Sequence, residues 1–320
     1  MRDAGGIALL LLGAAACSSS STPSHSDDVE HPRVVETLAQ GRNHPGSIVV
    51  DGSRVYWIDV GQLYASNGAV LSAPLDGGAP HTMASKRKNP AGLAVVGAYV
   101  YWTDHFAPGY VMRAPLDGGV PVTLAADVAN PTGVAVDATG VYFTSENSVV
   151  RAAEDGGVPT TLATSLDNPT AIAIAGGSLY WTESDIPGAV ATMRLDGGAV
   201  ATIAAMESDP TALAVDSKRV YWTDNAAPGA VAAARLMGGA SLVTLSTAPS
   251  GPLGIAVDEA TAYTTSGNRG DAGAIVAVPL DGGTVSTIVT GQDGPSGVAV
   301  DATWVYWTDT YAGTVMRATK

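Results

Sequence analysis

The sequence Val100-Tyr-Trp-Thr-Asp104 occurs again, unchanged, as Val220-Tyr-Trp-Thr-Asp224 and Val305-Tyr-Trp-Thr-Asp309. Four further copies are degenerate, and successive tyrosines of the seven copies are 38 to 45 residues apart. A period of about 40 residues that holds several short strands is typical of a β-propeller blade. The seven tyrosines are Tyr56, Tyr101, Tyr142, Tyr180, Tyr221, Tyr263 and Tyr306.

Two further positions keep a fixed distance from each tyrosine. The residue that opens an apolar strand lies nine positions earlier, and a proline lies two positions before that opening residue. Because neither spacing varies, these connections carry no insertions, and each repeat begins with the same turn and strand. The opening residues are Ser47, Gly92, Gly133, Ala171, Ala212, Gly254 and Gly297.

Each repeat is predicted to form four strands. The inner strand resembles residues 133–137, and the tyrosine strand is the second. The third resembles residues 109–114 and the outer strand residues 122–125. A Leu-Asp-Gly-Gly turn, as at residues 116–119, joins the last two strands, since Asp-Gly and Gly-Gly supply the positive φ angles of tight hairpins. Alanine recurs midway along the inner strands, which fits strands crowded at a propeller axis, with the Tyr and Trp rings farther out.

The two ends of the chain predict how the ring closes. The last repeat stops at Lys320, before its outer strand, and a matching strand occurs at residues 34–39. An N-terminal strand that completes the last blade would leave no open sheet edge. We therefore expect an all-β fold, a seven-bladed propeller of four-stranded blades over residues 34–320.

The repeated Tyr-Trp-Thr-Asp sequence resembles the YWTD repeats of low-density-lipoprotein-receptor-type propellers. The resemblance covers residues 34–320, with departures at Tyr142-Phe-Thr-Ser145 and Tyr263-Thr-Thr-Ser266. That family has six blades and binds proteins on one propeller face, whereas seven repeats are counted here. The resemblance implies the fold and a protein-binding role, and it implies no enzymatic activity.

The N-terminus resembles a bacterial lipoprotein signal over residues 1–17. An apolar segment of about ten residues, too short to span a bilayer, ends at Ala14-Ala-Ala-Cys17. Cleavage would leave Cys17, the only cysteine, as an acylated N-terminus that holds the protein to a membrane through lipid alone. Residues 18–33 are expected to be a flexible tether. The expected location is the bacterial cell envelope, extracytoplasmic and at the outer membrane; the alternative is an ordinary secretory signal.

The net charge of the chain restricts its partners. A charge of −14 and a pI near 4.5 exclude nucleic acid as a natural partner. We expect a monomer that binds a protein or a carbohydrate.

Polar residues recur directly before the proline of each repeat, where the inner strands begin. Asn-Pro and Asp-Pro are common turn initiators, so turn formation is one explanation. The other is a cation site at the mouth of the axial channel, because amide and carboxylate oxygens suit calcium. In that hypothesis Asp209 would bind calcium together with Asn130 and Asn168. The full set of candidate ligand-binding residues is His44, Asn89, Asn130, Asn168 and Asp209.

The loops that follow the tyrosine strands vary most in length, and function concentrates on such loops. Blade 1 carries the long loop 61–68 and blade 6 carries the loop 267–273. The only basic cluster, residues 85–89, is expected on the same face. The candidate partner-binding rim consists of Tyr64, Lys86, Arg87, Lys88, His105, Phe106, Arg269, Asp271 and Tyr311.

The sequence favours a binding protein over an enzyme. It contains no Gly-x-Ser-x-Gly elbow, no His-Glu-x-x-His and no phosphate-binding loop. The primary hypothesis is a recognition scaffold, with no catalytic residues and no certain cofactor. The alternatives are a metal-dependent hydrolase or lyase, with its site at the axial mouth around His44, Asn130, Asn168 and Asp209, and a passive component of envelope assembly.

Overall fold

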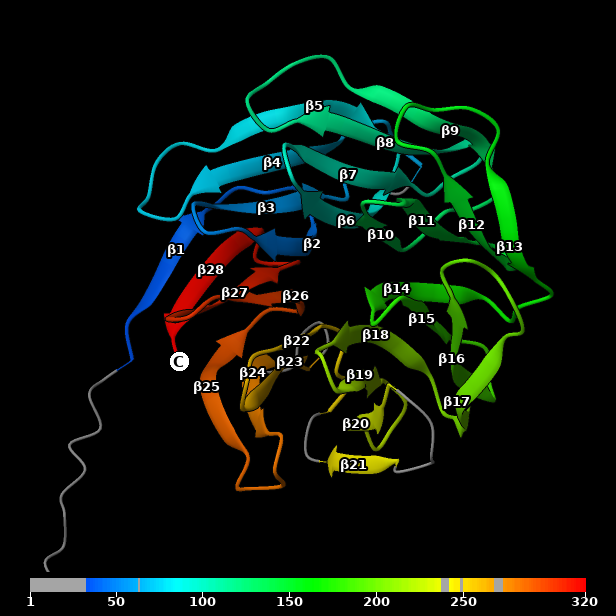
Figure 1. Ribbon diagram of the computed structural model, residues 1–320. Coiled ribbons are helices and arrows are strands. Elements are labelled where there is room, and N and C mark those ends of the chain that lie inside the picture. The colour runs from blue at the N-terminus through cyan, green and yellow to red at the C-terminus, as the bar shows by residue number, and fades with distance from the viewer. Residues whose placement is uncertain (1–32, 63, 237–241, 248–249, 268–272) are drawn as a thin grey trace, which may run out of the picture. The chain divides into compact units, whose positions relative to one another are not determined.

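The computed structural model describes residues 33–62, 64–236, 242–247, 250–267 and 273–320. These residues form seven antiparallel four-stranded sheets, arranged as blades around an axis (Figure 1). They contain no helix, and therefore none that could cross a membrane. Residues 33–320 make up one compact unit. The predicted all-β, seven-bladed propeller is confirmed.

Each blade runs from an inner strand outward in chain order. Blade 1 contains β2 (Pro45–Val50), β3 (Arg54–Asp59), β4 (Gly68–Pro74) and β5 (His81–Arg87); blade 2 contains β6 (Pro90–Val96), β7 (Tyr99–Asp104), β8 (Gly109–Pro115) and β9 (Val122–Val128). Blade 3 contains β10 (Val134–Asp137), β11 (Gly140–Ser145), β12 (Ser148–Ala152) and β13 (Thr160–Thr164); blade 4 contains β14 (Pro169–Ala175), β15 (Ser178–Glu183), β16 (Gly188–Arg194) and β17 (Ala201–Glu207). Blade 5 contains β18 (Pro210–Val215), β19 (Arg219–Asp224), β20 (Ala230–Arg235) and β21 (Val243–Ser246); blade 6 contains β22 (Ile255–Val257), β23 (Thr261–Ser266), β24 (Gly273–Pro279) and β25 (Ser286–Gln292). Blade 7 contains β26 (Pro295–Val300), β27 (Trp304–Asp309), β28 (Thr314–Thr319) and β1 (Val35–Ala39).

The ring closes as the sequence predicts. β1 pairs antiparallel with β28, with Val35 opposite Ala318, so the N-terminal strand is the outer strand of the last blade. The blue β1 and the red β28 lie side by side in Figure 1. Arg317 of β28 also forms an ion pair with Glu36 of β1. The closing sheet is therefore held by backbone pairing and by charge.

The Tyr-Trp dipeptide joins neighbouring blades. Successive side chains of a strand point to opposite faces, so the tyrosine of one blade and the tryptophan of the next meet in one core. Tyr56 packs in a core with Trp102 of blade 2, and Tyr142 packs with Trp181 of blade 4. Trp57 meets Tyr306 across the junction that closes the ring. Every tryptophan that follows a motif tyrosine is fully buried, which confirms that the aromatic rings fill the gaps between blades.

The threonine of the motif forms a hydrogen-bond bridge between blades. Thr144 accepts from the N–H of Gly133 in its own blade at 2.7 Å and donates to the carbonyl oxygen of Thr170 in blade 4 at 2.7 Å. Thr103 and Thr308 make the same pair of hydrogen bonds in blades 2 and 7. Blade 1 has Ile58 at this position, and there the Ser47 hydroxyl donates to the carbonyl oxygen of Ala91 at 2.6 Å.

The residue that opens each inner strand decides whether this bridge forms. A Cβ atom added to Gly92 or Gly133 would lie 2.4 Å from a carbonyl oxygen of the next blade, so glycine permits the close approach. In blades 4 and 5 the opening residues are Ala171 and Ala212. There the motif threonines instead contact a threonine hydroxyl of their own inner strand, at 2.9 and 3.1 Å.

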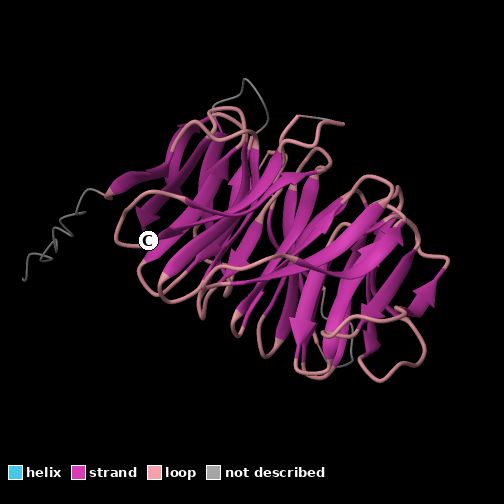
Figure 2. Cartoon of the chain, turned by 90° about the horizontal axis from the view of Figure 1, so that it is seen from above, coloured by secondary structure: helices cyan, strands magenta, loops and turns pink. Residues whose placement is uncertain are grey.

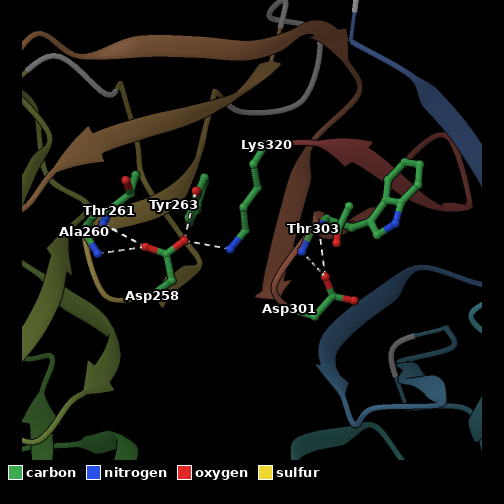
Figure 3. A network of polar contacts seen from close by, with 8 residues as sticks. Asp258, Ala260, Thr261, Tyr263, Asp301, Thr303 and Lys320 are labelled. Atoms are coloured by element: carbon green, nitrogen blue, oxygen red, sulfur yellow. Dashed lines mark hydrogen bonds and ion pairs between the residues drawn. The ribbon is translucent and has the colours of Figure 1, made fainter.

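The turns between inner and second strands lie on one face of the ring, which we call the lower face. In blade 6, Asp258 accepts from the backbone N–H groups of Ala260 and Thr261, from the Tyr263 hydroxyl and from Lys320 (Figure 3). The same hydrogen bond from the motif tyrosine hydroxyl to the turn aspartate occurs in blades 1, 5 and 7. The motif tyrosine thus also fixes the turn that precedes its strand.

Candidate functional site

The opposite face, which we call the upper face, carries the loops after the second strands and the connections that lead into the inner strands. Figure 2 shows that loops gather at the two faces of the ring. On the upper face the two kinds of segment are tied together by backbone hydrogen bonds: Val60 donates to His44 at 3.0 Å and His105 donates to Asn89 at 3.1 Å. The predicted sharing of one face by these segments is therefore observed.

The backbone geometry before the proline of each repeat restricts which residue types fit there. His44, Asn89, Asn130 and Asn168 have φ angles of 54°, 53°, 46° and 51°. Asparagine tolerates this left-handed region better than most residues, and Gly251 and Gly294 occupy it in blades 6 and 7. Turn formation thus accounts for most of the recurring asparagines, while Asp209 is not in the left-handed region.

Their side chains contact groups of their own blades. Asn168 donates through Nδ2 to the Ser184 hydroxyl at 2.8 Å, and Asn225 donates through Nδ2 to Asp209 Oδ2 at 3.3 Å. His44 lies 3.3 Å from the side-chain oxygen of Asn43. Within the described ranges, no three His, Cys, Asp or Glu side chains come together as a metal site requires. The calcium site remains a prediction, with Asp209 as its single carboxylate among the three proposed ligands.

The axial mouth holds a cavity of about 340 Å³, whose lining residues the sequence analysis did not single out. Its wall is formed by the opening residues of the inner strands and by the residues on either side of them. The hydroxyl-bearing residues of this wall are Ser47, Thr132, Thr170, Thr211 and Ser296. The cavity is therefore uncharged, and apolar residues such as Ile48 and Leu93 line it together with these hydroxyl-bearing residues. The fixed position directly before the opening residue was the signal that could have revealed it.

The last residue of the motif strand anchors the upper-face connections, and its environment differs among the blades. Asp224 accepts from the backbone N–H groups of Ser208 and Asp209 at 3.1 and 2.7 Å. Burial raises the pKa of Asp104 to about 6, and the ion pair with Arg87 at 3.3 Å only partly offsets it. Burial also raises the pKa of Asp309 to about 6, and the charge of Asp293 adds to the effect.

The structure brings some predicted rim residues together and separates others. The rings of Tyr64 and Phe106 stack with centroids 4.9 Å apart, and His105 lies 5.2 Å from Phe106. Tyr311 instead meets His44 edge to face at 6.4 Å, at the junction of blades 7 and 1. Arg87 pairs inward with buried Asp104, while Lys86 is exposed. Arg269 and Asp271 lie outside the described residues, as does Cys17.

Comparison with known proteins supports the fold. No protein-family model and no curated protein matches the chain. Among solved structures it is similar to the WD40 β-propeller domain of Doa1, at 12% identity and a TM-score of 0.68, over 90% of this chain and 97% of that one. A chain of a nidogen/laminin complex matches at 23% identity and a TM-score of 0.60, over 74% and 96%. A puromycin hydrolase matches at 14% identity and a TM-score of 0.63, over 87% of this chain but 54% of that one. At these identities the similarity establishes the propeller fold alone.

Proposed function

We propose that this protein is a recognition scaffold of the bacterial cell envelope, held to a membrane by lipid on Cys17, that binds a protein or a glycan through its upper face. Propellers commonly serve as binding scaffolds, and one structure similar to this chain is a complex of nidogen with laminin. The YWTD resemblance favours the same role. The observation that carries the proposal is the exposure of large apolar side chains on this face, since aromatic and Met side chains are enriched in binding interfaces.

These side chains come from three blades. Tyr64, Ile186, Met206 and Tyr311 are 74%, 78%, 77% and 46% exposed. Tyr64, Ile186 and Tyr311 belong to loops of the upper face, and Met206 lies near the end of β17 that leads into this face. Exposed apolar side chains on one face give a partner surface to bury.

We expect the combined substitution Ile186→Asp and Met206→Asp to weaken binding of purified residues 33–320 to isolated cell envelopes at least about tenfold, because each buried apolar contact of this kind contributes 1 kcal/mol or more. The matched control is Val120→Asp with Val158→Asp, since these valines are 84% and 94% exposed on lower-face turns. Binding is measured by co-sedimentation. Equal binding by both double variants, or no binding by the wild type, would refute the proposal.

The anchor is tested separately with the full chain. We expect the wild type to fractionate with membranes and Cys17→Ser to appear in the soluble extracytoplasmic fraction, because the acyl chains supply the membrane affinity. Mass spectrometry of the wild-type N-terminus should show an acylated Cys17. A soluble wild-type protein that is cleaved elsewhere would instead establish an ordinary secretory signal.

A further inference from the structure

An aromatic pair on the upper face is built from two blades. Tyr64 comes from the loop between β3 and β4, and Phe106 comes from the loop between β7 and β8. Their rings are stacked, with centroids 4.9 Å apart and planes inclined by 20°, and His105 lies against Phe106 at 5.2 Å. Tyr64 is 74% exposed, so much of its side chain remains open to solvent although its ring stacks on Phe106.

The loop holds Tyr64 in an unfavourable backbone conformation. Its φ angle is 64°, which costs about 1–2 kcal/mol for a residue with a bulky side chain. Nearby hydrogen bonds fix the loop: Gly61 donates to the carbonyl oxygen of Asn43 at 3.0 Å, and the backbone N–H of Gln62 donates to Asn67 Oδ1 at 2.9 Å. A strained conformation that displays an exposed aromatic ring suggests a function other than stability.

Positive charge adjoins this aromatic pair. Lys88 donates through Nζ to the carbonyl oxygen of Ala107, the residue that follows Phe106, at 3.1 Å. Lys86, two residues earlier, is exposed. Arg87, between them, is occupied by its ion pair with buried Asp104. In a chain of net charge −14, Lys88 lies beside an exposed aromatic stack, and exposed Lys86 is two residues away in the sequence, which favours a negative ligand here.

We propose that Tyr64, Phe106 and Lys88 form a binding site for an anionic polysaccharide, in which one sugar ring stacks on Tyr64 and its acidic group pairs with Lys88 and Lys86. The C–H groups on the flat side of a pyranose ring carry partial positive charge and complement the negative face of an aromatic ring. A carboxylate or phosphate on the same sugar complements the lysines. This inference rests on the proposed function, because it names the ligand class of the upper face.

The test uses purified protein and matched ligands. Oligogalacturonate and its fully methyl-esterified form share one backbone and differ in charge; hyaluronan, heparin and lipopolysaccharide core oligosaccharide extend the anionic set. We expect saturation-transfer NMR to show ring protons of at least one anionic sugar at the protein surface. Its affinity by titration calorimetry should fall about tenfold in Tyr64→Ala and about threefold in Lys88→Gln. Val120→Ala, on a lower-face turn, should leave the affinity unchanged. Tyr64→Trp should retain binding.

Several results would overturn the inference. The first is that none of the anionic sugars binds. The second is that methyl-esterified oligogalacturonate or linear polyphosphate binds as tightly as the anionic sugar. The third is that Tyr64→Ala binds the anionic sugar with unchanged affinity. Envelope binding that disappears after protease digestion of the envelopes would identify a protein partner and also overturn it. In that case the upper-face double variant would still lose binding, so the recognition function would stand while the sugar ligand would fail.

Discussion

We expect Gly133→Ala to lower the free energy of unfolding by about 3 kcal/mol, from overpacking and from the loss of a hydrogen bond between blades. A Cβ atom at this position would lie 2.4 Å from the carbonyl oxygen of Thr170 and 3.0 Å from Ile172 Cγ2. Moving that carbonyl away would break its hydrogen bond from the Thr144 hydroxyl. Denaturant unfolding of residues 33–320, followed by tryptophan fluorescence, measures the change.

The neighbouring blade offers the matched control. Ala171 occupies the position equivalent to Gly133, and the motif threonine of its blade, Thr182, contacts the Thr170 hydroxyl within the same blade. Ala171→Gly should therefore change stability by less than about 1 kcal/mol. If Gly133→Ala changed the free energy of unfolding equally little, blades 3 and 4 would not approach each other as closely at the Thr170 carbonyl oxygen as described.

The architecture could be predicted because it follows from spacing within the chain. The inner strand expected at residues 133–137 forms as β10, and the strand expected at residues 34–39 forms as β1. The burial of the Tyr and Trp rings also follows from the strand period, since adjacent side chains must point into opposite gaps between blades. These features depend on local sequence repeated seven times.

The site could be predicted only in part, because it depends on contacts between blades. Tyr64 and Phe106 were each recognised as rim residues, yet nothing in their spacing indicates that the rings stack. The role of Arg87 depends on the burial of Asp104, which belongs to the next blade. Distances across blade junctions are set by packing and are not encoded in any one repeat.

The two buried aspartates Asp104 and Asp309 should make the protein most stable at mildly acidic pH. The pKa of each is about 6 in the folded protein, against the usual aspartate value of 3.8. A carboxyl group with a raised pKa binds its proton more tightly in the folded state, so stability rises as pH falls through 6 and is lost again as pH rises. Between about pH 7 and pH 5 each group should add about 1.4 kcal/mol, or about 3 kcal/mol together.

The gain in stability on acidification ends at the pH where protonation of other aspartates begins to destabilise the folded protein. At Asp51 and Asp216 burial alone would raise the pKa, but hydrogen bonds from turn N–H groups and a tyrosine hydroxyl outweigh burial and lower it. Their contribution is present above the unfolded pKa and is lost as pH falls below about 4. The maximum of stability should therefore lie near pH 4–5.

The substitution Asp309→Asn isolates one of the two groups. Denaturant unfolding at a series of pH values should show about half of the wild-type gain between pH 7 and pH 5, because Asp104 is then the one of these two aspartates that can still take up a proton. The matched variant is Asp224→Asn, since Asp224 ends the motif strand of blade 5 as Asp309 ends that of blade 7, and it accepts two backbone N–H groups. It should lower stability at every pH and leave the gain intact. A wild-type protein whose stability does not change over this interval would show that both carboxylates are better solvated than their burial implies.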